Sequence, residues 1–278
     1  MDKKLLKDFI EKCIQEDIKD GDHTSICCIP ENKNGTANLI SKQDAIVAGV
    51  YLAKEIFNYY DKNLKIDIYK NDGQKIKNKD TILKVSGNIR SILAMERLVL
   101  NCMQRMSGIA TQTKKINELV SDYNVKILDT RKTTPNIRFL EKWAVKIGGG
   151  DNHRMGLYDA ILIKDNHIDY SGGISYAVEK AINYSKNIKH LPIIVEVRNL
   201  DELNKILKFK EISRIILDNF KINEVEEAVK IVSKEFLLEI SGNINEINII
   251  KYAKTGVDYI SIGALTHSVK NIDLSLKA

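Results

Sequence analysis

From about residue 125 onward, short apolar runs alternate with longer segments in which apolar positions recur every three or four residues. Short runs rich in β-branched residues are typical of buried strands, and the longer spacing is typical of amphipathic helices. Strands are predicted at residues 125–129, 160–163, 193–197, 214–217, 236–240 and 259–262. Helices are predicted between them at residues 173–185, 200–208, 222–233 and 244–253. This alternation predicts an α/β fold with a parallel sheet.

Six strands that share one direction can form either an open doubly wound sheet or a closed or nearly closed barrel. An open sheet that binds a dinucleotide would carry a GxGxxG motif directly after its first strand. No such motif is present there, and Gly148-Gly149-Gly150 follows a helix-like segment instead. The pattern therefore favours a barrel.

The first 103 residues have a different pattern. It comprises an N-terminal amphipathic segment at residues 1–18, strand-like runs at 35–41 and 65–69, and a helix that begins near residue 91. The turn sequence Asn71-Asp72-Gly73, between strand-like runs, is typical of antiparallel pairing. We therefore predict a small α+β domain at residues 1–103 and a barrel domain at residues 104–264, with no Pro/Gly-rich linker between them.

The composition is that of a soluble globular chain, since 44% of the 278 residues are hydrophobic and 29% are charged. No apolar run approaches the ~18 residues of a membrane-spanning helix, and the N-terminal segment lacks the features of a signal peptide. The four cysteines form neither a CxxC pair nor a disulfide-like framework. We expect a cytoplasmic protein with no membrane partner.

The net charge of +6 is compatible with three kinds of partner: nucleic acid, an anionic membrane or a small acidic substrate. Most lysines are interleaved with acidic residues, but five of the eight arginines fall within one stretch of the chain: Arg97, Arg105, Arg131, Arg138 and Arg154. A planar guanidinium binds carboxylate or phosphate bidentately, which an ammonium group cannot do. The clustering favours a small acidic substrate, although ordinary structural ion pairs remain an alternative at this point.

Polar residues of complementary chemistry follow each of the six predicted strands, where barrel enzymes place their active sites. They are Arg131 with Lys132, Lys164, Glu196, Asp218 with Asn219, Ser241-Gly242-Asn243, and Gly263-Ala264; a polar connection adds Asn152-His153-Arg154. The cations suit carboxylates or pyrophosphate, the carboxylates suit ribose hydroxyls or Mg²⁺, and glycine loops let backbone N–H groups approach a phosphate. Any one of these residues can be purely structural, but their agreement across all six strand ends favours a binding site. His167 is left open, and His23, His190 and His267 are interpreted as structural or surface residues.

Three of these segments together resemble the quinolinate phosphoribosyltransferase family: the run DTRKTTP at residues 129–135, Asn152-His153-Arg154, and the run IKDNH at residues 163–167. The resemblance extends over nearly the whole chain. It includes Glu16-Asp17, Gly21-Asp22 with Thr24, Glu96-Arg97 with Leu98 and Asn101, the run SGIAT at 107–111, Val195-Glu196-Val197, Leu217-Asp218-Asn219 and the run at 239–243.

The resemblance implies a two-domain subunit of the type II phosphoribosyltransferase kind. An N-terminal α+β sandwich would be followed by an incomplete α/β barrel of six or seven strands, and residues 265–278 would return to the sandwich. The subunit would form a homodimer, with higher assembly left open, in which the partner's N-terminal domain completes each active site. The implied reaction, part of de novo NAD biosynthesis, joins quinolinate to 5-phosphoribosyl-1-pyrophosphate and gives nicotinate mononucleotide, pyrophosphate and CO₂.

The resemblance also implies a role for each residue at the strand ends. Arg97 would reach the other subunit's site, and Arg131, His153, Arg154 and Lys164 would line the quinolinate pocket. Lys132, Glu196 and Asp218 form the expected catalytic set: Lys132 would bind the diphosphate, and the two carboxylates would hold ribose hydroxyls and Mg²⁺. The expected phosphate-binding residues are Ser241, Gly242, Asn243, Gly263 and Ala264. One departure is Asn136, where the family usually has glycine; asparagine tolerates a left-handed backbone better than most residues, so we expect the loop to keep its conformation.

Two alternatives to this function are compatible with parts of the sequence. A related transferase that acts on another base, such as the homologues associated with molybdenum transport genes, is disfavoured by the retention of the full cationic set. A non-catalytic anion-binding or nucleic-acid-binding protein would place basic residues on an exposed face with interleaved aromatics. Only 6% of this chain is aromatic, and its arginines converge on predicted strand ends. We therefore expect no nucleic-acid partner.

Overall fold

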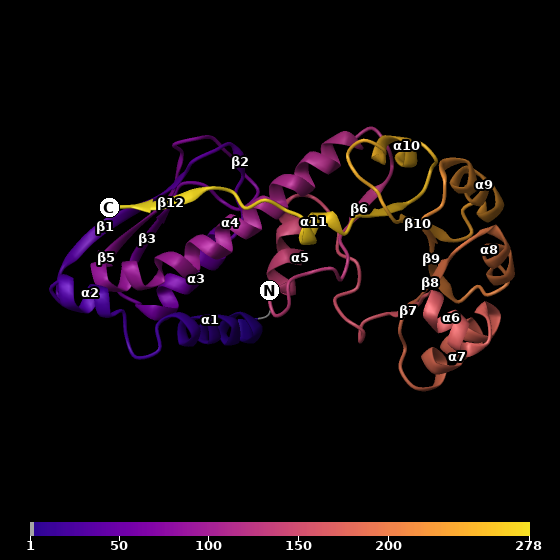
Figure 1. Ribbon diagram of the computed structural model, residues 1–278, viewed down its shortest axis with the longest axis horizontal. Helices are drawn as coiled ribbons and strands as arrows, with labels where there is room; N and C mark the ends of the chain where they lie inside the picture. Colours follow the sequence, from indigo (N-terminus) through magenta and orange to yellow (C-terminus); the bar gives the residue numbers. More distant parts are fainter. Residues whose placement is uncertain (1–2) are drawn as a thin grey trace. The chain divides into compact units, whose positions relative to one another are not determined.

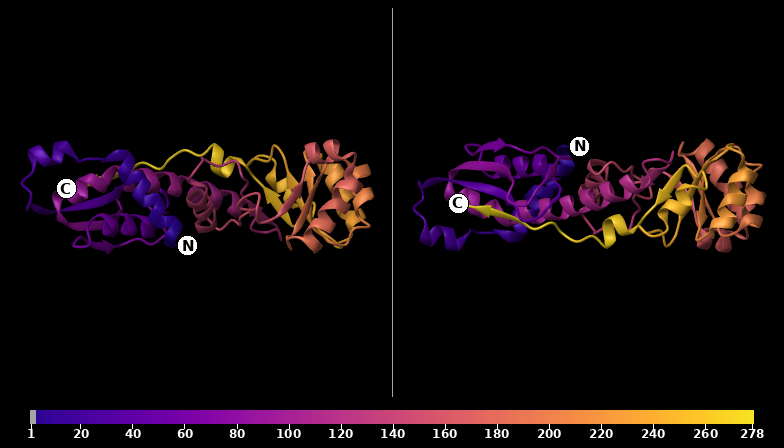
Figure 2. Two further views of the ribbon diagram at one scale, coloured as in Figure 1. Left: turned by 90° about the horizontal axis from the view of Figure 1, so that it is seen from below. Right: turned by 90° about the horizontal axis from the view of Figure 1, so that it is seen from above.

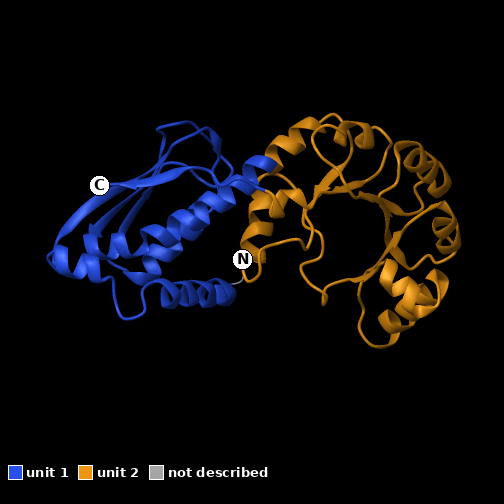
Figure 3. Ribbon diagram, in the orientation of Figure 1, with its two compact units in different colours: residues 1–112, 269–278 blue, residues 113–268 orange. Residues whose placement is uncertain are grey.

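The computed structural model describes residues 3–278 and divides the chain into two compact units (Figures 1 and 3). Unit 1 contains the chain up to residue 112 together with residues 269–278, and unit 2 contains residues 113–268. The first boundary lies inside α4 (Ile89–Leu119), beyond the expected position at residues 103–104. Because α4 is one continuous helix, no change in local composition marks the place where one unit ends.

Unit 1 contains an antiparallel four-stranded sheet in the order β12-β1-β5-β3. Its strands are β1 (Asn34–Ser41), β3 (Lys65–Ile68), β5 (Thr81–Asn88) and β12 (Leu274–Lys277), and a second small sheet pairs β2 (Ala45–Ile46) with β4 (Lys75–Ile76). The helices α1 (Lys3–Asp17), α2 (His23–Cys28) and α3 (Val50–Tyr60) precede α4. The predicted antiparallel pairing is confirmed, and the C-terminal strand β12 returns to pair with β1 (Figure 2).

The turn at residues 71–73 does not join two paired strands, as its sequence had suggested. It connects β3 to β4, but β3 pairs with β5 and β4 pairs with β2. The Asp72 carboxylate instead accepts the backbone N–H of Val50 at 2.8 Å, at the first residue of α3. Because Gly49 at the start of that helix has no side chain to cap it, Asp72 supplies the missing acceptor from 22 residues away.

Unit 2 is a six-stranded parallel sheet in the order β6-β11-β10-β9-β8-β7. Its strands are β6 (Lys126–Leu128), β7 (Ile161–Ile163), β8 (Ile193–Val197), β9 (Ile212–Asp218), β10 (Leu237–Ser241) and β11 (Tyr259–Ser261). The strands curve around a common interior with helices outside them, and β6 and β7 are the two edges that do not pair (Figures 1 and 3). All six predicted strands are present, and the predicted incomplete barrel is confirmed.

Four helices were predicted in unit 2, and three of them, α7, α8 and α9, lie close to their predicted positions. The unit contains α5 (Arg138–Ile147), α6 (Asp165–Ser171), α7 (Ile174–Asn187), α8 (Leu200–Ile206), α9 (Ile222–Val232), α10 (Ile249–Ala253) and α11 (Ala264–His267). The segment predicted to be helical from residue 244 begins only at Ile249. The Asn245 side chain accepts the N–H of Ile247 at 2.9 Å, and such local side-chain bonds compete with the helix. The short helix α6 was not predicted.

Strand alternation explains why the interior of the barrel is polar at one end. Successive side chains of a strand point to opposite faces, and both faces of this sheet are covered. Val195, Ile215 and Ile240 face the outer helices and are fully buried. Ala160, Ile194 and Ile216 form an apolar cluster on the inner face with Leu162 packed against it, and the inner positions that follow toward the carboxyl ends are polar: Lys164, Glu196 and Asp218. Among the described helices, none is long and apolar enough to cross a membrane.

Candidate active site

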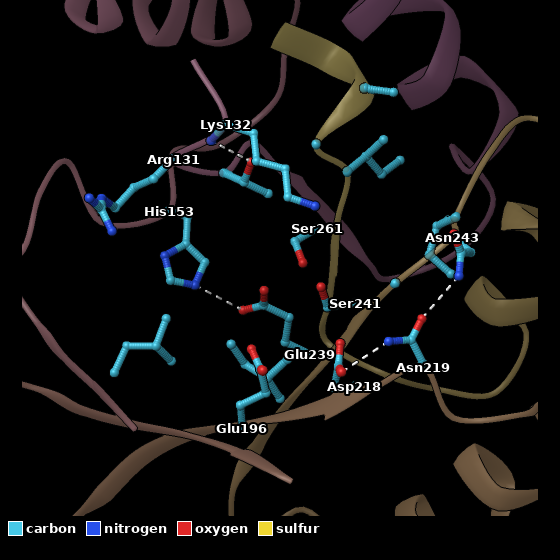
Figure 4. Close-up of a pocket in the computed structure, with 18 of the residues that line it drawn as sticks. Arg131, Lys132, His153, Glu196, Asp218, Asn219, Glu239, Ser241, Asn243 and Ser261 are labelled. Carbon is cyan, nitrogen blue, oxygen red and sulfur yellow. Dashed lines mark hydrogen bonds and ion pairs between the residues drawn. The ribbon is translucent and has the colours of Figure 1, made fainter. Parts of the chain in front are cut away.

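A cavity of about 820 Å³ opens at the carboxyl ends of the strands of unit 2 (Figure 4). Toward the carboxyl ends of the strands, every second residue points to the inner face and lines the cavity. These residues are Leu162 and Lys164, Glu196, Ile216 and Asp218, Glu239 and Ser241, and Ser261 and Gly263. The loops between strands and helices add further residues: Thr130, Arg131, Lys132, His153, Arg154, Asn219, Gly242, Asn243, Ile244, Asn245, Ile262, Ala264 and His267. The size is that of a small-molecule site.

Every residue that the sequence assigned to the site lines this cavity except Arg97. Arg97 is an exposed residue of α4 in unit 1. Its expected role depends on a second subunit, so that role stays a prediction.

The loop after β6 presents Arg131 and Lys132 to the cavity. Both side chains are exposed, and within residues 3–278 neither forms a hydrogen bond or an ion pair. The loop itself is well anchored, because the Lys132 carbonyl accepts the Thr266 hydroxyl at 2.8 Å and the Lys132 N–H donates to the Thr130 hydroxyl at 3.1 Å. Asn136 has a φ of 65°, so it adopts the left-handed conformation that was expected of it.

His153 is a buried, neutral imidazole at the edge of the cavity. Its Nδ1 accepts the backbone N–H of Arg154 at 2.7 Å, so the ring proton resides on Nε2. Burial, reinforced by the charges of Arg214 and Lys142, lowers the pKa of His153 to about 3. His153 can therefore donate one hydrogen bond from Nε2 to a ligand but adds no charge.

The Nε2 atom of His153 faces the Glu239 carboxylate at 3.6 Å, and the two side chains point toward one another in Figure 4. Glu239 is only 1% exposed, its oxygens have no hydrogen-bond partner of good geometry within residues 3–278, and Arg214 lies 3.2 Å from one of them. Burial raises the pKa of Glu239 to about 6, against the attraction of Arg214. A buried carboxylate is costly unless it is paired, so Arg214 offsets part of the cost of burying Glu239. Glu239 also lines the cavity.

Lys164 and Glu196 form an ion pair of 2.7 Å across the floor of the cavity. Burial raises the pKa of Glu196, while Lys164 opposes the shift and the nearby charge of Asp218 adds to it. Lys164 therefore lines the cavity and is already paired with Glu196 before any ligand binds.

Glu196 and Asp218 are the carboxylates best placed for a cation. No cluster of three or more His, Cys, Asp or Glu residues within the described chain could hold a metal ion. Two adjacent carboxylates fit Mg²⁺, which commonly takes one or two carboxylates and completes its shell with substrate oxygens and water. The repulsion between Asp218 and Glu196 would be relieved by such an ion.

Another part of the cavity lining comes from the loops that follow β10 and β11. Asn243 donates to Asn219 at 3.1 Å, and Asn219 donates to Asp218 at 2.9 Å, so a chain of side chains joins this loop to a carboxylate. Gly242 has a φ of 101°, and a side chain there would collide with Asn219. The loop therefore requires glycine, and its backbone is open to a ligand.

Several cavity residues were not assigned from the sequence. Glu239 and Ser261 lie two positions before Ser241 and Gly263, so strand alternation could have placed them on the same face. His267, interpreted from the sequence as structural or surface, is exposed and lines the cavity beside Gly263. Nothing in its local sequence indicated this.

The fold and the cavity together define an α/β-barrel enzyme that binds anionic substrates. The lining of the cavity combines cations, carboxylates and glycine-containing loops. The family models "Quinolinate phosphoribosyl transferase, N-terminal domain" and "Quinolinate phosphoribosyl transferase, C-terminal domain" match residues 22–107 and 109–277. The chain belongs to the quinolinate phosphoribosyl transferase family.

Individual relatives are similar in sequence to this chain over nearly its whole length. The quinolinate phosphoribosyltransferase [decarboxylating] 2 of Nicotiana glauca is 42% identical over 98% of this chain and 82% of its own length. The probable nicotinate-nucleotide pyrophosphorylase [carboxylating] of Bacillus subtilis is 39% identical over 99% of this chain and 92% of its own. The solved structure of the nicotinate-nucleotide pyrophosphorylase from Francisella tularensis is 43% identical, with a TM-score of 0.92 over 100% of this chain and 97% of that one.

Proposed function

We propose that this chain transfers the phosphoribosyl group of 5-phosphoribosyl-1-pyrophosphate to quinolinate and releases pyrophosphate and CO₂, forming nicotinate mononucleotide for de novo NAD biosynthesis. The observation that carries the proposal is the convergence of Arg131, Lys132, Arg154 and Lys164 on one cavity whose centre holds Glu196 and Asp218. A dicarboxylate and a diphosphate are the ligands that such a set of cations can neutralise.

Quinolinate binds on the side of the cavity formed by the first two strand ends. Arg131 and Arg154 provide guanidinium forks for its carboxylates, and Lys164 adds a positive charge that it shares with Glu196. His153 is neutral and donates from Nε2, so it orients the substrate without adding charge.

The phosphoribosyl donor spans the centre and the other side. Lys132 faces the diphosphate, Glu196 and Asp218 accept hydrogen bonds from ribose hydroxyls, and the 5-phosphate lies against the loops after β10 and β11. The residues of those loops are Ser241, Gly242, Asn243, Gly263 and Ala264. Glu196 and Asp218 would hold Mg²⁺, which would supply charge neutralisation for the leaving pyrophosphate.

The chemistry needs orientation and charge stabilisation more than a protein nucleophile. As the bond from ribose C1 to pyrophosphate breaks, the sugar carbon gains oxocarbenium character, and the quinolinate nitrogen, fixed by the cations, attacks it. The quaternised ring nitrogen then stabilises the electron pair left on C2 when the 2-carboxylate departs as CO₂. A proton taken up at C2 completes nicotinate mononucleotide.

The assembly and location of the enzyme are further parts of the proposal. Arg97 lies outside the cavity lining, and we propose that it enters the site of a second subunit in a homodimer, with higher assembly left open. A cytoplasmic location agrees with the sequence pattern.

One assay tests the proposed function. Purified protein is incubated with quinolinate, 5-phosphoribosyl-1-pyrophosphate and Mg²⁺, and nicotinate mononucleotide and pyrophosphate are quantified, with nicotinate as the control substrate. We expect product from quinolinate and none from nicotinate, because the pocket has cations for two carboxylates. Activity with nicotinate alone would overturn the assignment of the substrate.

A further inference from the structure

Helix α5 carries three charged side chains that the proposed chemistry does not use. Arg138, Glu141 and Lys142 are spaced three and four residues apart, so they share one face of the helix. Glu141 is 0% exposed and Lys142 is 1% exposed, and none of the three lines the cavity. Burying charges is costly unless each one is paired and hydrogen-bonded, so their contacts indicate what they do.

Lys142 ties the end of β6 to the segment that carries His153. Its ammonium group forms an ion pair with Asp129 and donates to the His153 carbonyl at 3.0 Å. The Asp129 carboxylate also accepts the backbone N–H of His153 at 2.8 Å and the Asn152 amide at 2.6 Å. Asp129, the first residue of the DTRKTTP run, is therefore an anchor under the site rather than a ligand.

Arg138 and Glu141 hold the far end of the same loop. Glu141 accepts the N–H and the hydroxyl of Thr134, both at 3.0 Å. Arg138 donates to the Thr133 hydroxyl at 2.8 Å and to the Met155 carbonyl at 3.0 Å, so one guanidinium joins both segments.

The two segments carry cations that repel each other. Burial, followed by the positive charge of Arg131, lowers the pKa of Arg154. The positive charges of Arg131 and Arg154 therefore oppose a close approach of the two segments.

We propose that Arg138, Glu141 and Lys142 of α5, with Asp129, are positioning residues that hold the Arg131 loop and the His153-Arg154 segment at a fixed separation before substrate binds. The helix sets the spacing of the two guanidinium forks, so the cost of bringing like charges together is met during folding rather than during binding. The part of this inference that concerns the ligand rests on the proposed function.

Arg138→Met removes a side chain that hydrogen-bonds to both segments and keeps most of its apolar stem. The matched control is Lys146→Met, which removes a charge from the same helix, where Lys146 forms a partly exposed ion pair with Asp151. Hydrogen exchange in the ligand-free proteins is the first measurement. We expect amides of residues 130–134 and of residues 152–155 to exchange at least about fivefold faster in Arg138→Met and to be unchanged in Lys146→Met.

Quinolinate binding, measured by calorimetry, is the second measurement. The dissociation constant should rise at least about tenfold in Arg138→Met and stay within about twofold of wild type in Lys146→Met. In an Arg131→Lys background, Arg138→Met should raise the dissociation constant for quinolinate by less than about twofold. A residue that acts through the guanidinium fork of Arg131 loses its effect when that fork is gone. A merely structural role would cost the same factor in both backgrounds.

We use the term clamp for the fixed separation that Arg138, Glu141, Lys142 and Asp129 impose on the two segments. The two measurements separate failure of the clamp from failure of the proposed function. Unchanged exchange in both segments, or equal quinolinate affinity in Arg138→Met and Lys146→Met, would overturn the clamp. Wild-type protein that does not bind quinolinate would overturn the proposed substrate, and the exchange measurement would still decide on the clamp. Should Arg138→Met fail to fold, Arg138→Lys keeps the charge but lacks the fork, and it should give the same pattern with smaller changes.

Discussion

Arg131 is the residue at which the difference between guanidinium and ammonium is expected to matter most. It lies in the exposed part of the DTRKTTP run and lines the cavity, and its side chain forms no hydrogen bond or ion pair within residues 3–278. Arg131→Lys keeps the charge but removes the fork, so we expect kcat/KM for quinolinate to fall by about 100-fold with an unchanged melting temperature. Steady-state kinetics with each substrate varied in turn measure this. Unchanged kinetics would contradict the assignment of a carboxylate fork to Arg131.

His153 makes the stability of unit 2 depend on pH. Its pKa is about 3 in the folded protein, because burial and neighbouring cations disfavour the charged ring, against about 6.5 in an unfolded chain. Between these values the unfolded state binds the extra proton, so the contribution of His153 is complete above the unfolded pKa and is lost as pH falls below it. From about pH 7 to about pH 5 the loss is about 2 kcal/mol. The raised pKa of Glu239 acts in the opposite direction over the same range, so the test is the difference between two proteins. Urea unfolding at several pH values should show a larger loss of stability on acidification in wild type than in His153→Gln, and equal losses would contradict the role of His153.

At the residue scale, the sequence predicted which side chains line the cavity. It did not predict how those side chains interact with one another. Residues such as Asp218 and Ser241 were found because chemistry in a parallel barrel gathers at strand ends. The ion pair between Lys164 and Glu196 could not be predicted, since it depends on the register of two neighbouring strands and on side-chain conformations. That His267 lines the cavity could not be predicted, because its position depends on how the chain turns after β11.

At the scale of single elements, the strands of the barrel were more predictable than the short helices and turns. Both faces of a parallel sheet are buried, so its strands are continuous apolar runs that local sequence reveals. The shortening of α10 follows from hydrogen bonds made by Asn245, and the role of the turn at 71–73 follows from a contact with a helix 22 residues earlier. Such competition between local and distant partners is not visible in hydrophobic periodicity.

Asp72 provides a direct test at this scale. Its carboxylate accepts the N–H of Val50 at the start of α3, and burial raises the pKa of Asp72 against these backbone hydrogen bonds. Asp72→Ala should destabilise the protein by about 1 kcal/mol, as the loss of an N-terminal helix cap usually does. Asp67→Ala, a change at a more exposed residue of β3 in the same unit, is the control and should cost less. Equal free energies of unfolding for the two variants would contradict the capping role.

At the scale of the whole molecule, the alternation of strands and helices favoured a parallel barrel after an antiparallel domain, and the resemblance to the family implied that the barrel is incomplete. The boundary between the units was not predictable to the residue, because α4 has the same helical periodicity on both sides of it. The sequence and the structure also leave one residue of the expected site outside the cavity lining, which is Arg97. Its role therefore has to be tested on the assembled protein.

Mixing two inactive variants tests whether Arg97 acts on another subunit's site. In a heterodimer of Arg97→Ala and Lys132→Ala subunits, the barrel of the Arg97→Ala subunit keeps Lys132 and receives an intact Arg97 from its partner. Half of the randomly mixed dimers are heterodimers and each has one intact site, so activity should recover to about a quarter of wild type. If Arg97 served its own subunit, both sites would stay defective and no activity would return. A mixture of Lys132→Ala and Glu196→Gln subunits is the control: both defects lie in the barrel, so it should stay inactive although its subunits exchange equally well.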